Sequence, residues 1–478
     1  MPGASPAWRL GPRLIATLVG AALAGALAVL QPLVGLAVAL IALVWALLRE
    51  IPVERMAPVA VVATAFAAVA GPNLAAPPAP WLFLFRILIV ALGLGVLGYL
   101  LMGRSITIPA PMAGPAGLLG VWFCWSALSI GWAQDPLYAL RWTSFFAMMA
   151  GMAIAIGLLC RDRRRARTLL WWLLAIGAIA GIVAVGEVLT GRHLPTFRAD
   201  ALDRGGLIGV GSLFGNQNNF AAFLSLGLPY VAVLPVVYRD VRIRALGIGA
   251  GLAALAFILL SGSKSGLLAA AVVLLGLLLV VGLDRRNRGR IGVAAVMAVL
   301  AVVVVVPSLG GGGLVPLDER TTDKFSLTLL RDQIEGQYGS GGVRAALLGD
   351  GLGLVAETNG LGVGAGNAEV RVGALADSPT VSNLHNWWLE VLVDGGVVAL
   401  AIYLVFFLIL VRRQLREARR ADDPFVRYMC LAGGLSLCGW VIGSVGPSTS
   451  IHFAPMWIVF GLGMGSLVLA REARRSAS

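Results

Sequence analysis

Charged residues are scarce in this chain of 478 residues. They make up 13% of it, whereas soluble proteins carry about 25%. Hydrophobic residues account for 59%, and the mean hydropathy is +0.88. Such a surface suits lipid rather than water, which excludes a soluble globular protein. The apolar runs are continuous rather than alternating, as in membrane-spanning helices. The composition therefore predicts an all-α fold, a polytopic transmembrane helical bundle.

Cysteine, histidine and lysine are scarce as well. The four cysteines lie in or beside apolar stretches, which argues against a disulfide framework or a thiolate metal site. No acidic cluster or Cys/His set has the spacing of metal ligands, so we predict no metal and no cofactor. The net charge of +13 indicates basic loops kept on the cytoplasmic side rather than binding to nucleic acid.

Fourteen apolar segments are candidate spans. The first has basic residues before it, as a signal peptide has, but we interpret it as an uncleaved helix because many spans follow. The segments are 12–30, 33–48, 57–72, 81–102, 114–133, 143–160, 169–189, 213–237, 244–260, 264–282, 291–308, 389–411, 428–445 and 452–470.

Basic residues fall into alternate connections between these segments. Of the 37 Lys and Arg residues, 26 lie in the two tails and in every second loop. The positive-inside rule then places both termini in the cytoplasm. Two loops on the opposite side are long, 190–212 and 309–388, and a loop of about eighty residues predicts a functional role. Apolar residues at helical spacing predict one short helix in the second loop, from Val343 to Val355.

The segment Asn383-Leu384-His385-Asn386-Trp387-Trp388, followed by Glu390, lies just before the twelfth span. Imidazole titrates near neutrality, so His385 could accept a proton from a hydroxyl nucleophile. The alternative is a polar residue at the membrane surface beside tryptophans, which favour that depth.

A second polar motif, Gly211-Ser212-Leu213-Phe214-Gly215-Asn216-Gln217-Asn218-Asn219, opens the eighth span. Its amide side chains could cap a helix, or the helix start could bind an anion or a sugar. Arg198 and Arg204 lie just upstream.

Cations elsewhere on the same side support an anionic ligand. Lys264 stands in the short turn Ser261–Gly266, where it either has a functional role or extends toward lipid headgroups. Arg344 lies in the long loop, before a glycine-rich element at 362–367 that we interpret as a tight turn. Together with His385, these cations suit a phosphate or pyrophosphate on a lipid.

The order of these motifs resembles the O-antigen ligase/polymerase family of bacterial envelope polysaccharide synthesis. The last two elements are most similar to the teichuronic acid biosynthesis polymerase branch. The matching elements are Phe214-Gly215-Asn216-Gln217-Asn218, Ser263-Lys264-Ser265, Gly362-Val363-Gly364-Ala365-Gly366-Asn367 and His385-Asn386-Trp387-Trp388-Leu389-Glu390. The likeness implies a multi-pass protein of the bacterial plasma membrane, with a catalytic region at 190–411 between N-terminal helices at 1–189 and C-terminal helices with a cytoplasmic tail at 412–478.

The resemblance also implies a reaction. It is a metal-independent, inverting glycosyl transfer from a polyprenyl-pyrophosphate donor to an acceptor glycan at the outer face. His385 would be the general base. Arg204, Lys264, Arg344 and Arg198 would be the candidates for binding pyrophosphate, although Lys264 replaces the family's usual arginine and lacks its bidentate fork.

For the acceptor or the glycan chain, the expected residues are polar or aromatic neighbours of the same motifs. They are Asn216, Asn218, Asn386, Trp387, Trp388 and Glu390. The motifs do not separate a polymerase from a ligase. The alternative from another class is a lipid-linked glycan flippase or polysaccharide exporter, which should carry charges deep in the bundle.

Overall fold

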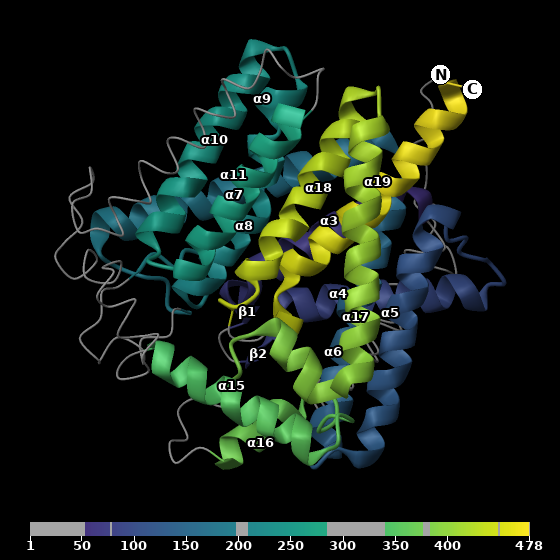
Figure 1. The fold of residues 1–478 in the computed structure, drawn as a ribbon. Coiled ribbons are helices and arrows are strands. Elements are labelled where there is room, and N and C mark those ends of the chain that lie inside the picture. The colour runs from purple at the N-terminus through teal and green to yellow at the C-terminus, as the bar shows by residue number, and fades with distance from the viewer. Residues whose placement is uncertain are drawn as a thin grey trace, which may run out of the picture.

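The computed structural model describes residues 53–76, 79–196, 209–283, 340–375, 383–447 and 450–477. They form a helical bundle with one short antiparallel hairpin, β1 (Ala75–Ala76) and β2 (Ala79–Phe83), in which Ala75 pairs with Phe83 (Figure 1). The helices are α3 (Val53–Ala70), α4 (Leu84–Leu101), α5 (Ala110–Leu128), α6 (Pro136–Leu159), α7 (Arg163–Thr190), α8 (Gln217–Ala232), α9 (Leu234–Val237), α10 (Val241–Leu260), α11 (Lys264–Leu283), α15 (Ser340–Glu357), α16 (Asn367–Leu375), α17 (Trp387–Arg420), α18 (Pro424–Gly443) and α19 (Ala454–Ala477), with 3-10 turns η1 (Gly71–Leu74), η2 (Ser129–Trp132) and η5 (Ser450–His452).

Ten of the described helices are long and apolar enough to cross a membrane, so the chain is a multi-pass membrane protein. The predicted helical fold is confirmed. A shorter apolar helix, Met56–Ala70, stands where we expected a span at 57–72. The predicted spans at 12–30, 33–48 and 291–308 lie outside the described residues, so the total of fourteen stays a prediction.

Successive helices run in opposite directions, so the connections between them lie at two opposite ends of the bundle. The arginine-rich segments at 161–167, 239–244, 412–427 and 471–475 share one end, which we call the basic end. Aspartates begin three helices there, because a side-chain oxygen can accept from the first free backbone N–H groups. These N-caps are Asp162 of α7, Asp240 of α10 and Asp423 of α18.

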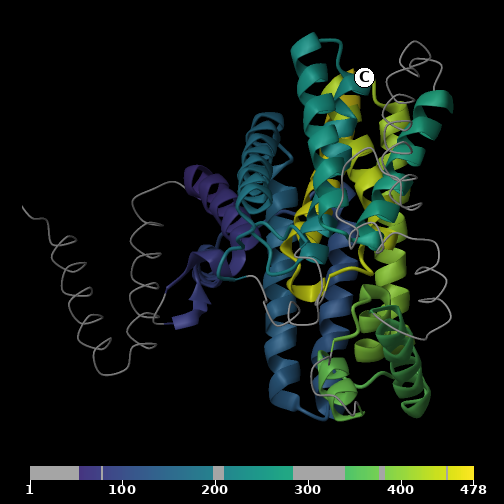
Figure 2. The same ribbon diagram turned by 90° about the vertical axis from the view of Figure 1, so that its left-hand side faces the viewer.

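The opposite end carries the polar motifs, and we call it the motif end. It comprises residues 129–135, 209–216, 261–263, 383–386 and 444–447. Helices α15 and α16 lie at the same end, at the bottom of the view in Figure 1 and again in Figure 2, opposite the labelled C-terminus. The predicted helix from Val343 to Val355 is confirmed by α15.

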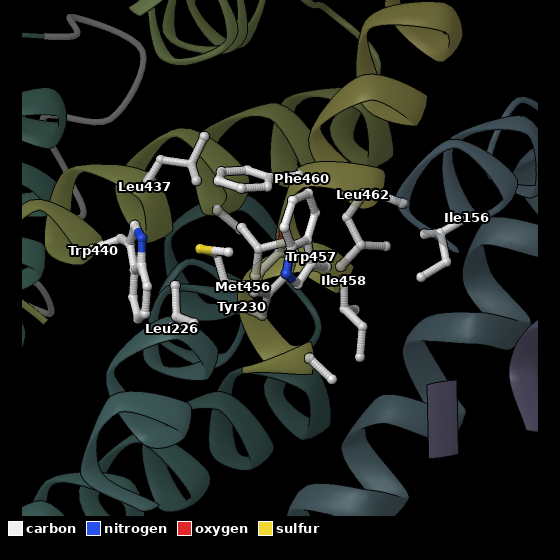
Figure 3. Close-up of a cluster of buried hydrophobic side chains, with 14 of the residues drawn as sticks. Ile156, Leu226, Tyr230, Leu437, Trp440, Met456, Trp457, Ile458, Phe460 and Leu462 are labelled. Carbon is white, nitrogen blue, oxygen red and sulfur yellow. The ribbon is translucent and has the colours of Figure 1, made fainter. Parts of the chain in front are cut away.

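The centre of the bundle is formed by α8, α18 and α19, which are the most buried of the candidate spans. Figure 3 shows Trp440 of α18 with Trp457 and Phe460 of α19, all fully buried. Glycines let the helices approach closely: a Cβ at Gly461 would lie 2.6 Å from the carbonyl oxygen of Ala153 on α6. Close packing of small residues holds helices together in lipid, where the hydrophobic effect between them is lost.

Helix α17 is folded back on itself rather than straight. Gly396 has φ +69° and ψ −169°, outside the helical region, and separates a first segment from the long second one. In a straight helix Trp388 and Phe407 would stand about 28 Å apart, from a rise of 1.5 Å per residue. Their ring centroids are 5.4 Å apart. The first segment therefore runs antiparallel to the second and returns His385 to the bundle.

The reversal predicts that Gly396→Ala destabilises the protein. A side chain is strained at this φ, and its Cβ would overlap the carbonyl oxygen of Gly360. We expect a loss of about 2–3 kcal/mol, seen as a lower thermal midpoint of the protein in detergent. Gly349→Ala in α15 is the matched control, because no atom lies within 4 Å of its added Cβ. Equal midpoints for the two variants would contradict this account of the reversal.

Candidate functional site

Three helices begin at the motif end with the residues that the sequence singled out. Asn216 precedes α8, Lys264 is the first residue of α11, and Asn386 precedes α17. A helix N-terminus carries roughly half a positive charge and free backbone N–H groups, so such ends attract anions. The arrangement concentrates positive potential where the sequence predicts a phosphate-bearing substrate.

The turn after α18 joins these three helix starts. A Cβ on Gly446 would lie 2.6 Å from the Ser265 hydroxyl oxygen and 3.7 Å from the Cβ of Asn218. The backbone N–H of Trp387 donates to the carbonyl of Ser444 at 3.2 Å. The structure therefore brings together the Asn216, Lys264 and His385 motifs, through a turn that the sequence analysis did not single out.

The loop before α8 is held by a buried carboxylate, Glu187 of α7. Glu187 accepts from the backbone N–H groups of Gly211 and Ser212 at 3.0 and 2.8 Å, and lies 3.0 Å from Nδ1 of His193. Ser212 has φ +52° and donates its hydroxyl to the carbonyl of Ala180 at 2.6 Å. Sequence reasoning missed Glu187, although a carboxylate inside an apolar segment is itself a signal of function or of a special partner.

Two of the predicted glycan-binding asparagines cap helices. Asn216 accepts from the N–H of Asn219 at 2.8 Å, and Asn386 accepts from the N–H groups of Trp388 and Leu389 at 3.1 and 3.4 Å. The capping alternative is therefore confirmed for Asn216. Asn218 is half-buried and lies next to Gly446.

His385 is half-buried and occupies an unusual backbone conformation. Its φ is +50°, in the left-handed region that few residues other than glycine adopt. Its N–H donates to Oδ1 of Asn383, two residues earlier, at 3.0 Å. The other two histidines differ in their surroundings: His193 bonds Glu187, and the ring of His452 lies 4.2 Å from that of Phe145.

The two tryptophans after His385 pack into the bundle. Trp387 is fully buried, with its ring 5.7 Å from that of Tyr403 and 5.9 Å from that of Trp122. Trp388 is half-buried, and its Nε1 donates to the carbonyl of Val441 at 3.0 Å. These contacts belong to the core, so the positions that we assigned to glycan binding serve the packing of the His385 segment.

The glycine-rich element forms a tight turn, as predicted. Gly362, Gly364 and Gly366 all have positive φ. The N–H groups of Val363 and Gly364 donate to the carbonyls of Val393 and Asp394 at 2.8 and 2.9 Å. The turn therefore docks on the first segment of α17 and carries α16 with it.

Helix α15 carries Arg344 near its N-terminus. Gly351 faces Leu389, and Gly360 just after the helix faces Val397, so α15 runs parallel to the first segment of α17. Arg344 lies about two turns before Gly351, toward the motif end. Burial lowers the pKa of Arg344, because a cation removed from water is less stable unless an anion meets it.

Three predicted residues remain, namely Glu390, Arg198 and Arg204. Glu390 is buried and lines a small pocket of about 10 Å³, room for about one water, with Glu369, Asn383 and Asp394. Arg198 and Arg204 lie outside the described residues, as does the part of the long loop before residue 340. Within the described ranges, no three His, Cys, Asp or Glu side chains are grouped to hold a metal ion.

Comparisons with known proteins match these observations. The O-antigen ligase family model matches residues 249–404, which include the Lys264, Gly362 and His385 motifs. The chain is also 23% identical over 417 residues to the teichuronic acid biosynthesis protein TuaE of Bacillus subtilis (strain 168), which covers 82% of this chain and 80% of that protein. The resemblance predicted from the motifs is therefore confirmed.

The role of Glu187 predicts that Glu187→Ala loosens the loop before α8. The change leaves two buried backbone donors without their acceptor, each costing about 1–3 kcal/mol. We expect a clearly lower thermal midpoint in detergent. Val188→Ala is the matched control, since the neighbouring valine is 50% exposed on the same helix. A midpoint for Glu187→Ala no lower than that of the control would show that the carboxylate does not hold the loop.

Proposed function

We propose that this chain is a membrane glycosyltransferase, a polysaccharide polymerase or ligase. It transfers glycan from a polyprenyl-pyrophosphate donor to a hydroxyl of an acceptor glycan, with inversion and without a metal. The observation that carries the proposal is the convergence of His385, Lys264 and three helix N-termini at one end of a membrane bundle. The family match and the likeness to TuaE support it.

The orientation follows from the charge. The basic end faces the cytoplasm because loops rich in Arg are retained there. The motif end then faces outward at the bacterial plasma membrane, where a polyprenyl-linked glycan presents its sugar. The energy for transfer comes from the donor's pyrophosphate linkage, so no nucleotide is required at that face.

Cations and helix ends bind the leaving pyrophosphate. Lys264 adds a full charge to the N-terminus of α11, and the N-terminus of α8 lies across Gly446 from it. Arg344, buried enough to lower its pKa, gains from an anionic partner. Preorganised positive groups stabilise the charge that develops on the pyrophosphate in the transition state.

His385 acts as the general base. Its imidazole takes the proton of the acceptor hydroxyl while that oxygen attacks the anomeric carbon of the donor. The bond from that carbon to the pyrophosphate oxygen breaks, and polyprenyl pyrophosphate leaves with the electron pair. Attack from the face opposite the leaving group inverts the anomeric centre. The imidazolium then returns its proton to solvent.

An apolar cavity of about 540 Å³ provides a place for the donor's lipid chain. It lies between α7, α8, α10 and α19, with Gly181, Phe223, Gly227, Phe257 and Ile458 among its lining residues. Phe223 is less than two turns from the N-terminus of α8. A prenyl chain in this cavity would therefore leave its pyrophosphate close to the polar motifs.

The central test is His385→Ala in a strain whose surface polymer depends on this chain. Loss of a general base lowers the rate by about 10²- to 10⁴-fold, so we expect the polymer to disappear while the lipid-linked donor accumulates. His452→Ala is the control, another histidine at this end of the bundle, and should leave the polymer unchanged. Polymer of wild-type length and amount from a stably expressed His385→Ala protein would refute the assignment.

Deletion of this chain in the same strain distinguishes a polymerase from a ligase, and an assay in vesicles tests the flippase alternative. After deletion, mass analysis of lipid-linked intermediates shows short repeat units for a polymerase and long chains for a ligase. A purified protein that moves lipid-linked glycan across vesicles without extending it would instead be a flippase.

The cavity predicts a selective effect of Gly227→Leu. The added side chain occupies the lipid-chain volume, so we expect the KM for the lipid-linked donor to rise about 10-fold with little change in thermal midpoint. Gly249→Leu on α10 is the matched control. Both glycines are exposed and have no atom within 4 Å of an added Cβ, but Gly249 is not among the residues that line the cavity. Equal KM values for the two variants would show that the cavity does not bind the donor's lipid chain.

A further inference from the structure

A chain of hydrogen bonds links α6 to the backbone of His385. The hydroxyl of Tyr138 donates to Oε2 of Glu369 at 2.7 Å. Oε1 of the same carboxylate accepts from Nδ2 of Asn383 at 3.1 Å. Oδ1 of Asn383 accepts from the backbone N–H of His385 at 3.0 Å. The side chains of Tyr138, Glu369 and Asn383 thus connect α6 to the residue that we propose as the base.

Glu369 stands on a helix that is held on two sides. At the start of α16, Oδ1 of Asn367 accepts from the N–H of Asp135 at 2.7 Å. Ser129 accepts from the N–H of Ala365 at 2.9 Å. The N–H of Ala368 donates to the Asp394 carboxylate of α17 at 2.8 Å. The Glu369 carboxylate is therefore placed by both the α5–α6 turn and α17.

The backbone of His385 needs outside support. A left-handed conformation is unfavourable for a residue with a Cβ. The side chain of Asn383 stabilises it by an Asx-type bond to the N–H two residues on. Because φ and ψ determine where the Cα–Cβ bond points, this conformation sets the direction in which the imidazole leaves the chain.

Glu369 determines which way the Asn383 amide faces. An ionised carboxylate only accepts hydrogen bonds, whereas an amide has one donating and one accepting end. The donating Nδ2 must therefore face Glu369, and the accepting Oδ1 is left for the N–H of His385. A glutamine at 369 could face Asn383 with either end and would no longer select this orientation.

We propose that Glu369 is a positioning residue for the transfer reaction. With Tyr138 it orients Asn383, and Asn383 holds His385 in the conformation that aims its imidazole at the acceptor hydroxyl. The inference rests on the proposed role of His385. Glu369 itself touches neither donor nor acceptor in this scheme. A misplaced base slows the chemical step but leaves the contacts to the donor intact. Glu369 therefore affects the chemical step rather than donor binding.

The test is Glu369→Gln in the purified full-length protein, assayed with lipid-linked oligosaccharide extracted from the deletion strain. We expect kcat to fall about 10- to 100-fold, with the donor KM within about two-fold of wild type and a nearly unchanged thermal midpoint. Tyr138→Phe should give a smaller loss of the same kind. Glu357→Gln is the matched control, because this exposed carboxylate of the same loop pairs with Arg371.

Two results would overturn the inference. One is a wild-type kcat for Glu369→Gln. The other is a loss of kcat that is proportional to the fall in thermal midpoint across Glu369→Gln, Tyr138→Phe and Asn383→Ala. Lost packing, rather than a changed orientation of His385, would then explain the lower kcat. His385→Ala in the same assay separates the two proposals: if it is inactive while Glu369→Gln is normal, only the positioning role fails. If His385→Ala is fully active, the proposed base is wrong.

Discussion

The reversal at Gly396 is the constraint on which the motif end depends. Without it, Trp387 would stand about 24 Å beyond Tyr403 along one helix axis, whereas their rings are 5.7 Å apart. The glycine-rich turn packs directly against the backbone of α17 beside this reversal. A Cβ on Gly362 would lie 2.8 Å from the carbonyl oxygen of Asp394, so no side chain fits there. Glycine at both positions lets two backbone segments touch, and that contact carries the His385 segment back to the bundle.

Buried and half-buried carboxyl groups give this glycine-rich architecture its order. Glu187, Glu369 and Asp394 each accept hydrogen bonds from backbone or side-chain donors in other elements. Such hydrogen bonds offset the cost of taking a polar group out of water. Each one therefore fixes a loop that has little apolar surface of its own. These three side chains thus hold the backbone where helices alone do not.

Much of this organisation could be predicted from the sequence, because the signals are local. Apolar runs predicted the spans, helical spacing predicted α15, and the glycines at 362–366 predicted a tight turn. A helix start also satisfies its first N–H groups with the nearest side chain, so the cap at Asn216 could be foreseen. Trp387 could not be placed in this way. It follows a polar motif as a surface tryptophan does, but the reversal of α17 buries it against Trp122.

The contacts that organise the site are remote in sequence, and no local pattern announces them. Tyr138 and Glu369 are 231 residues apart, and Asp135 and Asn367 are 232 apart. A lone carboxylate in a short loop helix has many possible partners, and only the packing of α16 between α6 and α17 selects one. Glu187 and Asp394 are different, since each interrupts an apolar segment and could have been recognised by that alone.

The turn after α18 sets the distance between the two halves of the proposed reaction. On one side, the missing side chain of Gly446 lets the starts of α8 and α11 approach, and these are the helix ends assigned to pyrophosphate. On the other side, the carbonyl of Ser444 accepts from the N–H of Trp387, two residues after the proposed base. α18 belongs to the buried centre of the bundle and is packed along most of its length. The spacing of the proposed base and cations is therefore fixed by the core of the bundle, and α16 helps to orient His385 through Glu369 and Asn383.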